Sequence, residues 1–132
     1  MIGIDTNVLV RYFSQDDVKQ SKKATQVIEK KLSKEHPGFI SCVVMVELCW
    51  VLTRLYKVSK EDLCTIINGL LNAQEIEIEH REEVWKACRA FSGEGLDFSD
   101  VLLASIHKKH GCVYTVTFDK GAAKSSLFQL LK

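Results

Sequence analysis

The sequence has 132 residues, of which 46% are hydrophobic and 27% are charged, and its formal net charge is +1. These values are ordinary for a globular domain and exclude a disordered tail, a collagen-like chain and a low-complexity spacer. One proline and seven glycines also argue against an all-β chain with many tight turns. We therefore expect a single domain over residues 1–132 with one hydrophobic core.

Short apolar segments alternate with amphipathic segments along the chain. We expect strands at residues 1–5, 39–41, 75–78, 112–117 and 127–131. We expect helices at residues 6–13, 17–34, 43–56, 59–71, 81–91 and 97–110, and a short helical turn after Asp119. Ser59 is expected to cap one helix, and Gly111 to end another. This alternation predicts an α/β fold with a parallel sheet covered on both faces, in which ligands bind beyond the carboxyl ends of the strands.

The cysteines and the distribution of apolar residues indicate a cellular location. The five cysteines are odd in number, and none of their spacings is the C-x-x-C of a zinc or redox site. We interpret them as reduced structural residues, which are typical of a reducing cytosol. Asp5 interrupts the amino-terminal apolar segment, and the longest apolar stretch, residues 40–52, is too short to span a bilayer. We expect a soluble, cytoplasmic protein that does not associate with membranes.

Four acidic residues occupy positions that suggest a site. Asp5 ends the first expected strand, and Asp119 comes two residues after the fourth. Glu47 and Asp100 lie on apolar helices that must pack on the sheet, where an unpaired carboxylate is costly. Each acid also has a structural explanation. Asp5 and Asp119 can serve as helix caps or turn residues. Asp100 can lie in the first turn of a helix that Asp97 caps. Glu47 can lie at the edge of its helix face, where its carboxylate reaches water.

If the four acids converge, their mutual repulsion raises their pKa values unless a cation lies among them. Mg²⁺ and Mn²⁺ both favour such oxygen ligands. Without the four acids, 18 basic and 13 acidic residues remain, which gives a net charge of +5. An acidic hollow on a mildly basic body suits a polyanionic substrate. The lysines gather on residues 17–34 and at Lys108, Lys109, Lys120 and Lys124, although solvated helix faces explain them equally well.

Four segments resemble the motifs of the PIN-domain ribonucleases, in that family's order and over almost the whole chain. They are IDTNVLVRYF (4–13), ISCVVMVELCWVL (40–52), LDFSDVLLAS (96–105) and VYTVTFDK (113–120). They place Asp5, Glu47, Asp100 and Asp119 at the family's acidic positions, the last of which varies within the family. Ser99 stands where many members have a small apolar residue. In size the chain is similar to the single-domain VapC-like toxins.

The resemblance implies a three-layer α/β/α sandwich around a five-stranded parallel sheet, and endonucleolytic cleavage of RNA that depends on Mg²⁺ or Mn²⁺. It also implies two sets of site residues. The metal-binding and catalytic acids are Asp5, Glu47, Asp100 and Asp119, and the residues that orient carboxylates or phosphate oxygens are Thr6, Asn7 and Thr117. A small antitoxin would mask the site, and promoter DNA would bind only through that antitoxin. We also expect a homodimer.

Two other functions are compatible with the sequence. A haloacid-dehalogenase-like phosphatase also has an acid nucleophile at the end of its first strand. It requires a second acid two residues later, where this chain has Asn7, and it carries a long cap domain. The second alternative is a catalytically silent PIN-like module that binds RNA or protein. We expect the aromatic residues to pack in or beside the core rather than on bases or a partner helix; these residues are Tyr12, Phe13, Trp50 and Trp85.

Overall fold

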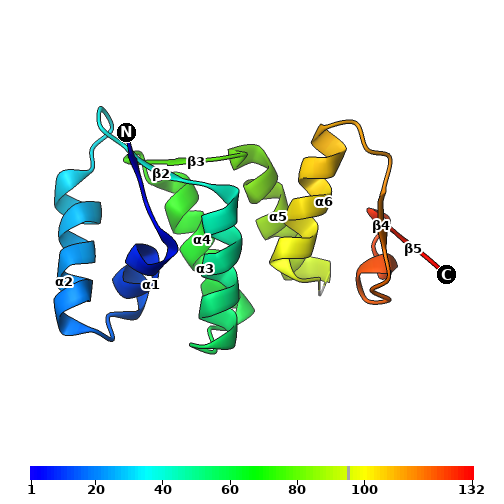
Figure 1. The fold of residues 1–132 in the computed structure, drawn as a ribbon, viewed down its shortest axis with the longest axis horizontal. Coiled ribbons are helices and arrows are strands. Elements are labelled where there is room, and N and C mark those ends of the chain that lie inside the picture. The colour runs from blue at the N-terminus through cyan, green and yellow to red at the C-terminus, as the bar shows by residue number, and fades with distance from the viewer. Residues whose placement is uncertain (95) are drawn as a thin grey trace. The chain divides into compact units, whose positions relative to one another are not determined.

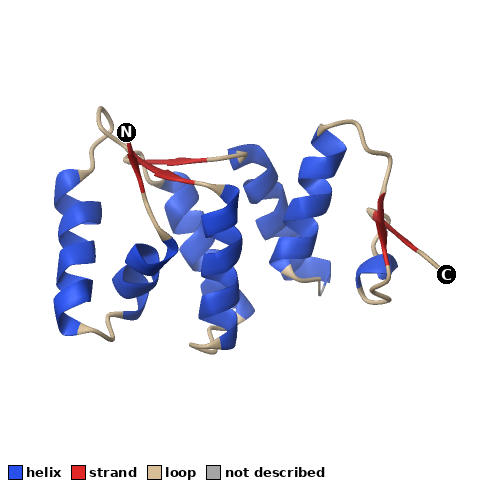
Figure 2. Cartoon of the chain, viewed as in Figure 1, coloured by secondary structure: helices blue, strands red, loops and turns tan. Residues whose placement is uncertain are grey.

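The computed structural model describes residues 1–94 and 96–132 (Figure 1). The chain divides into two compact units, Met1–Arg81 (unit 1) and Glu82–Lys132 (unit 2). Helices dominate both units and the strands are short (Figure 2). The expectation of a single domain over the whole chain stays a prediction.

Unit 1 contains a parallel sheet of three strands in the order β1–β2–β3, and all of its residues are described. Its elements are β1 (Ile2–Gly3), α1 (Thr6–Ser14), α2 (Val18–Gln26), the π-helical turn η1 (Val27–Lys31), β2 (Gly38–Ile40), α3 (Cys42–Arg54), α4 (Lys60–Asn72) and β3 (Ile76–Ile78). Figure 1 shows the strands grouped at one end of these helices. Because the strands are parallel, their carboxyl ends lie at one edge of the sheet, where β1 leads into α1 and β2 into α3.

Short polar side chains start the helices of unit 1. Asp17, Ser41 and Ser59 precede α2, α3 and α4, and each accepts a hydrogen bond from the backbone N–H three residues later, at 2.9, 3.3 and 3.1 Å. Such caps satisfy a backbone donor that the helix leaves free, and each contributes about 1 kcal/mol. The cap predicted at Ser59 is confirmed.

The helices of unit 1 pack on one another through a buried apolar core, with α1 in contact with both α2 and α3. Leu9, Met45 and Leu48 are completely buried. At Gly38 in β2, a Cβ atom would lie 2.5 Å from Ile4 Cδ1 and 2.8 Å from Leu32 Cδ1. A Cβ atom at this position would therefore require these two buried side chains to shift.

A polar cluster joins the ends of α1 and α3 to the loop before α2. Arg11 Nη1 donates to Asp16 Oδ1 at 3.0 Å and to the hydroxyl of Tyr56 at 3.2 Å. Ser14 Oγ and the Tyr56 hydroxyl each donate to the Asp16 carboxylate at 2.6 Å. These two hydrogen bonds, helped by the charge of Arg11, lower the pKa of Asp16 to about 2. The carboxylate therefore stays ionised in all but strongly acidic solution.

Unit 2 contains two helices followed by a pair of parallel strands, within residues 82–94 and 96–132. Its elements are α5 (Arg81–Glu94, which begins at the last residue of unit 1), α6 (Phe98–Lys109), β4 (Thr115–Thr117), the 3₁₀ turn η2 (Ala122–Lys124) and β5 (Phe128–Leu130). Ala104 of α6, Ala122 of η2 and Phe128 of β5 form a buried cluster. Lys109 Nζ lies 3.3 Å from Oε1 of the buried Glu83, and this ion pair joins α6 to α5.

The expected elements are confirmed, but several have different ends. The helix expected over residues 17–34 changes to a π-helical turn at Val27 and stops at Lys31. The strand expected over residues 112–117 shrinks to Thr115–Thr117, because Cys112 N donates to His107 O at 3.0 Å and so belongs to the end of α6. Gly111 ends this helix as predicted, with a φ of +92°.

The α/β class is confirmed, but the single five-stranded sheet is not what the described residues form. Over residues 1–94 and 96–132, the strands make one sheet of three and another of two. The strands are two or three residues long. Each therefore contributes few ladder hydrogen bonds, so that the helices supply most of the packing. Within the same residues, no helix has the length and the apolar character needed to cross a membrane.

Candidate active site

In unit 1, the residues expected at the site meet where α1 starts beside α3. Asp5 follows β1, and its Oδ1 accepts a hydrogen bond of 2.8 Å from Thr6 N. Thr6 is only 6% exposed, and its Oγ1 donates to Glu47 Oε1 at 3.1 Å. Thr6 thus contacts both acids, whereas Asn7 is exposed on the first turn of α1. The cap explanation accounts for Asp5 only in part, since a cap normally bonds the second or third backbone N–H of the helix.

The α3 face that carries Glu47 is exposed, which corrects the expectation that this apolar face is buried. Val43 and Trp50 are 69% and 56% exposed, and Glu47 is exposed between them. The buried face consists instead of residues such as Met45 and Leu48. The alternative in which Glu47 reaches water is therefore confirmed. Its carboxylate stays close to the sheet edge because Thr6 holds it, and not because it is buried.

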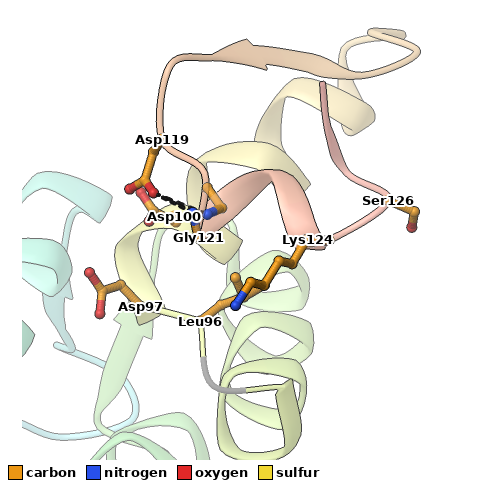
Figure 3. A pocket seen from close by; sticks show the side chains of 9 residues that line it. Leu96, Asp97, Asp100, Asp119, Gly121, Lys124 and Ser126 are labelled. Atoms are coloured by element: carbon orange, nitrogen blue, oxygen red, sulfur yellow. Dashed lines mark hydrogen bonds between the residues drawn. The ribbon is translucent and has the colours of Figure 1, made fainter. Parts of the chain in front are cut away.

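In unit 2, three carboxylates line a pocket of about 700 Å³ (Figure 3). The pocket lies between the start of α6 and the segment that follows β4. Its lining residues are Leu96, Asp97, Asp100, Asp119, Gly121, Ala122, Lys124, Ser125 and Ser126. Figure 3 shows the carboxylates of Asp100 and Asp119 beside each other, while Lys124 extends from η2 towards Leu96. The structure thus brings together two of the predicted acids.

Asp100 is half-buried in this pocket, and burial raises the pKa of its carboxyl group. The negative charges of Asp97 and Asp119 raise it further. Both causes disfavour the ionised form. A cation placed among these carboxylates would remove the repulsion, which is the chemistry expected of a divalent metal site.

A turn fixes the carboxylate of Asp119 relative to η2. Asp119 Oδ1 accepts hydrogen bonds from Gly121 N at 2.7 Å and from Ala122 N at 3.2 Å. Thr117 Oγ1, at the end of β4, accepts a hydrogen bond of 3.0 Å from Asp119 N. The structural explanation of Asp119 as a turn residue is therefore confirmed. One carboxylate oxygen serves the turn, and Asp119 still lines the pocket with Asp100.

Asp97 and Lys124 were not singled out as site residues by the sequence. Asp97 stands at the capping position of α6, but its side chain makes no capping hydrogen bond. Its spacing of three residues from Asp100 could have revealed it, because residues three apart share one helix face. Lys124 looked like one surface lysine among several, and only the turn that follows Asp119 places it at the pocket.

The donors fit a hard divalent cation by chemistry. The four candidate ligands, Asp5, Glu47, Asp100 and Asp119, all offer carboxylate oxygens. Burial and the charges of Asp97 and Asp119 disfavour the ionised form of Asp100, which a bound cation would favour. Across residues 1–94 and 96–132, no three histidine, cysteine, aspartate or glutamate side chains are arranged to hold one ion. Asp5 and Glu47 lie within unit 1, and Asp100 and Asp119 within unit 2. That all four share one metal site stays a prediction.

Comparison with known proteins assigns the chain to a family. The sequence model of the PIN domain matches residues 2–125. The chain therefore belongs to the PIN domain family, as its four motifs predicted. Within that family it is VapC-like. It is 26% identical over 117 residues to a VapC ribonuclease of Aquifex aeolicus (strain VF5), an alignment that covers 89% of this chain and 86% of the relative.

Proposed function

We propose that this protein is an endoribonuclease that depends on Mg²⁺ or Mn²⁺ and hydrolyses phosphodiester bonds in RNA. The observation that carries the proposal is the placement of carboxylates just beyond parallel strands in both units, in a chain of the PIN domain family. The similarity to a VapC ribonuclease supports RNA as the substrate. Single-stranded or looped RNA is the better target, because its splayed strand can reach a cleft.

We further propose that the five strands belong to one parallel sheet, as the resemblance to the PIN-domain ribonucleases implies. In the part of the chain that the structure describes, β1 pairs with β2 alone and β4 with β5 alone, so each has one unpaired edge. The segment around β4 also carries apolar side chains in water, since Val116 and Phe118 are 54% and 79% exposed. In a parallel sheet the carboxyl ends of the strands lie at one edge, which is where ligands bind in such folds.

In the proposed mechanism, Asp5, Glu47, Asp100 and Asp119 would hold the cation. A bound Mg²⁺ or Mn²⁺ would supply a Lewis acid that neutralises the phosphate and lowers the pKa of water. Thr6 would keep the Glu47 carboxylate oriented through their hydrogen bond of 3.1 Å.

The supporting polar residues act on the carboxylates or on the substrate. Thr117 would orient the turn that presents Asp119, through the hydrogen bond from Asp119 N. Asn7, exposed on the first turn of α1, would contact phosphate oxygens. Fixed donors of this kind stabilise charge as it develops in the transition state.

We also propose that the protein is a toxin whose site is masked by a small antitoxin, and the similarity to a VapC ribonuclease supports this. We propose that the protein acts in the cytoplasm as a homodimer and meets promoter DNA only through that antitoxin. A gene for a small protein next to the gene of this chain would support this pairing. Purification of the two proteins together, with loss of nuclease activity in the complex, would test it.

Cleavage of RNA by the purified protein tests the proposed activity. We expect cleavage of a labelled single-stranded RNA with Mg²⁺ or Mn²⁺, no cleavage with EDTA, and loss of cleavage in Asp5→Asn and Asp100→Asn. Asp62→Asn is the matched control, because this carboxylate is exposed on α4 and outside both groups of acids. Equal activity in wild type and Asp5→Asn, or cleavage unchanged by EDTA, would refute the proposal. RNA binding without cleavage would favour the silent module.

A further inference from the structure

The acidic pocket of unit 2 contains a basic residue that neither the motifs nor the proposed mechanism uses. We propose that Lys124 contacts a phosphate of the RNA backbone and holds the substrate against the carboxylates. This inference rests on the proposed function and adds a substrate-binding residue to it.

The composition of the pocket wall is the first observation. Among the residues that line the pocket, all of which the structure describes, Lys124 is the single basic one, against three aspartates. A positive charge beside the carboxylates favours the approach of an RNA phosphate, and lysine binds phosphate as a mobile point charge. Lys124 therefore supplies a positive charge on the pocket wall that a phosphate next to Asp100 can contact.

The position of Lys124 is fixed by the same turn that presents Asp119. Ala123 N donates to Asp119 O at 3.1 Å, and Lys124 N donates to Gly121 O at 3.3 Å. Ala122, at the start of η2, is 4% exposed and packs in the buried cluster with α6 and β5. The backbone of Lys124 is therefore anchored to Asp119, while its exposed side chain extends along the pocket (Figure 3).

The third observation is that Lys124 shares the pocket with three carboxylates but forms no ion pair with them, among the contacts of residues 96–132. Other lysines of unit 2 do form ion pairs, namely Lys86 with Glu82 at 3.4 Å and Lys109 with Glu83 at 3.3 Å. The ammonium group of Lys124 is therefore available to bind a ligand. The flanking hydroxyls of Ser125 and Ser126, which also line the pocket, are suitable donors to the same phosphate.

Binding of RNA to a non-cleaving background tests this inference. The probe is a fluorescently labelled single-stranded oligoribonucleotide of mixed sequence, titrated with Asp100→Asn protein at several salt concentrations. We expect an added Lys124→Ala to raise Kd about tenfold, the usual effect of losing one charge-assisted contact. We also expect the slope of log K against log salt to fall by about 0.7, the value for one phosphate contact on a single strand.

Two further variants serve as controls. Lys124→Arg keeps the charge and should bind nearly as well as the parent protein. Lys120→Ala removes an exposed lysine four residues away that does not line the pocket, and should leave Kd and the salt slope unchanged. In the active protein, Lys124→Ala should raise KM and change kcat by less than about twofold. Thermal melting of the variant checks that it is folded.

The inference is overturned if Lys124→Ala binds RNA with unchanged Kd and salt slope, or if Lys120→Ala weakens binding by the same factor. In the second case the lysines contribute only general attraction. Failure of the proposed function looks different: wild-type protein would not cleave RNA, yet the binding measurements would still separate the two lysines. The two results are therefore distinguishable.

Discussion

The three carboxylates that line the pocket of unit 2 lead to the prediction that removing one of them raises the stability of the protein and abolishes its activity. In Asp100→Asn, a neutral side chain of the same shape replaces the half-buried acid, whose pKa is raised by burial and by Asp97 and Asp119. Relief from two like charges at a partly exposed position is worth roughly 1 kcal/mol in the free energy of unfolding. For a chain of this size, that change raises Tm by about 3–4 °C. The same variant should lose RNA cleavage.

The dependence on pH provides a second measurement of the same effect. Because the pKa of Asp100 is raised above its ordinary value of 3.8, the folded protein takes up this proton more readily than the unfolded chain. In wild type, ionised Asp100 lowers the free energy of unfolding. This destabilisation is complete above the raised pKa of Asp100, and it disappears as the pH falls from that pKa towards 3.8. Differential scanning fluorimetry without divalent ions should show the Tm advantage of Asp100→Asn at pH 7 and its disappearance near pH 4.

Addition of a divalent metal ion should reverse the order of the Tm values, so that wild type melts at a higher temperature than Asp100→Asn. Mn²⁺ at about ten times its Kd stabilises a protein that binds it by roughly 1.4 kcal/mol, so wild type should gain about 5 °C and Asp100→Asn much less. Asp62→Asn is the control, because this acid lies in the first turn of α4, where negative charge is favourable, so its loss should lower Tm slightly. A lower Tm for Asp100→Asn in metal-free buffer, or a Tm difference independent of pH, would refute the reasoning on repulsion.

Four further substitutions test packing, helix propensity, hydrogen bonding and a buried ion pair. Gly38→Ala should cost about 1–3 kcal/mol in urea denaturation because its Cβ would lie 2.5 Å from a buried side chain. Gly69→Ala in α4, whose Cβ meets nothing within 4 Å, should instead add about 0.8 kcal/mol. Thr6→Val removes the 3.1 Å hydrogen bond to the α3 carboxylate, and we expect kcat/KM to fall about fivefold with Tm nearly unchanged; an equal kcat/KM would contradict a positioning role. Lys109→Met leaves the buried carboxylate of Glu83 without its 3.3 Å ion pair and should cost about 2 kcal/mol, less when combined with Glu83→Gln.

Local features of the fold were predictable because neighbouring residues determine them. Ser59 caps α4 and Gly111 ends α6, and both effects depend on backbone groups within a few residues. The extent of an element was less predictable where contacts from the next segment intervene. Cys112 has the sequence character of a strand, yet its backbone N–H completes the end of α6.

The buried face of α3 could not be predicted from the sequence. Val43 and Trp50 are apolar and yet exposed, whereas Met45 and Leu48 are completely buried. When a helix is apolar almost all round, periodicity does not define which face packs. Tertiary contacts with α1 and α4 decide it.

The acids of the site were predictable as residue types, but their partners were not. Nothing in the local sequence connects Thr6 to Glu47, which stand 41 positions apart and meet at 3.1 Å. The sequence predicts Asp97 to be a helix cap, but its side chain makes no capping hydrogen bond and lines the pocket. Spacing along the chain identifies candidates, and only packing shows which of them share a pocket.

The exposure of Asp5, Glu47 and Asp119 has a consequence for inactive forms of the protein. None of these three side chains contributes to the buried core, so a chain that loses one of them keeps its apolar packing. A mutation that inactivates the protein at one of these positions therefore yields a folded, inactive chain, and not an unfolded chain that proteases degrade. Such a folded, inactive chain would still bind the antitoxin proposed above.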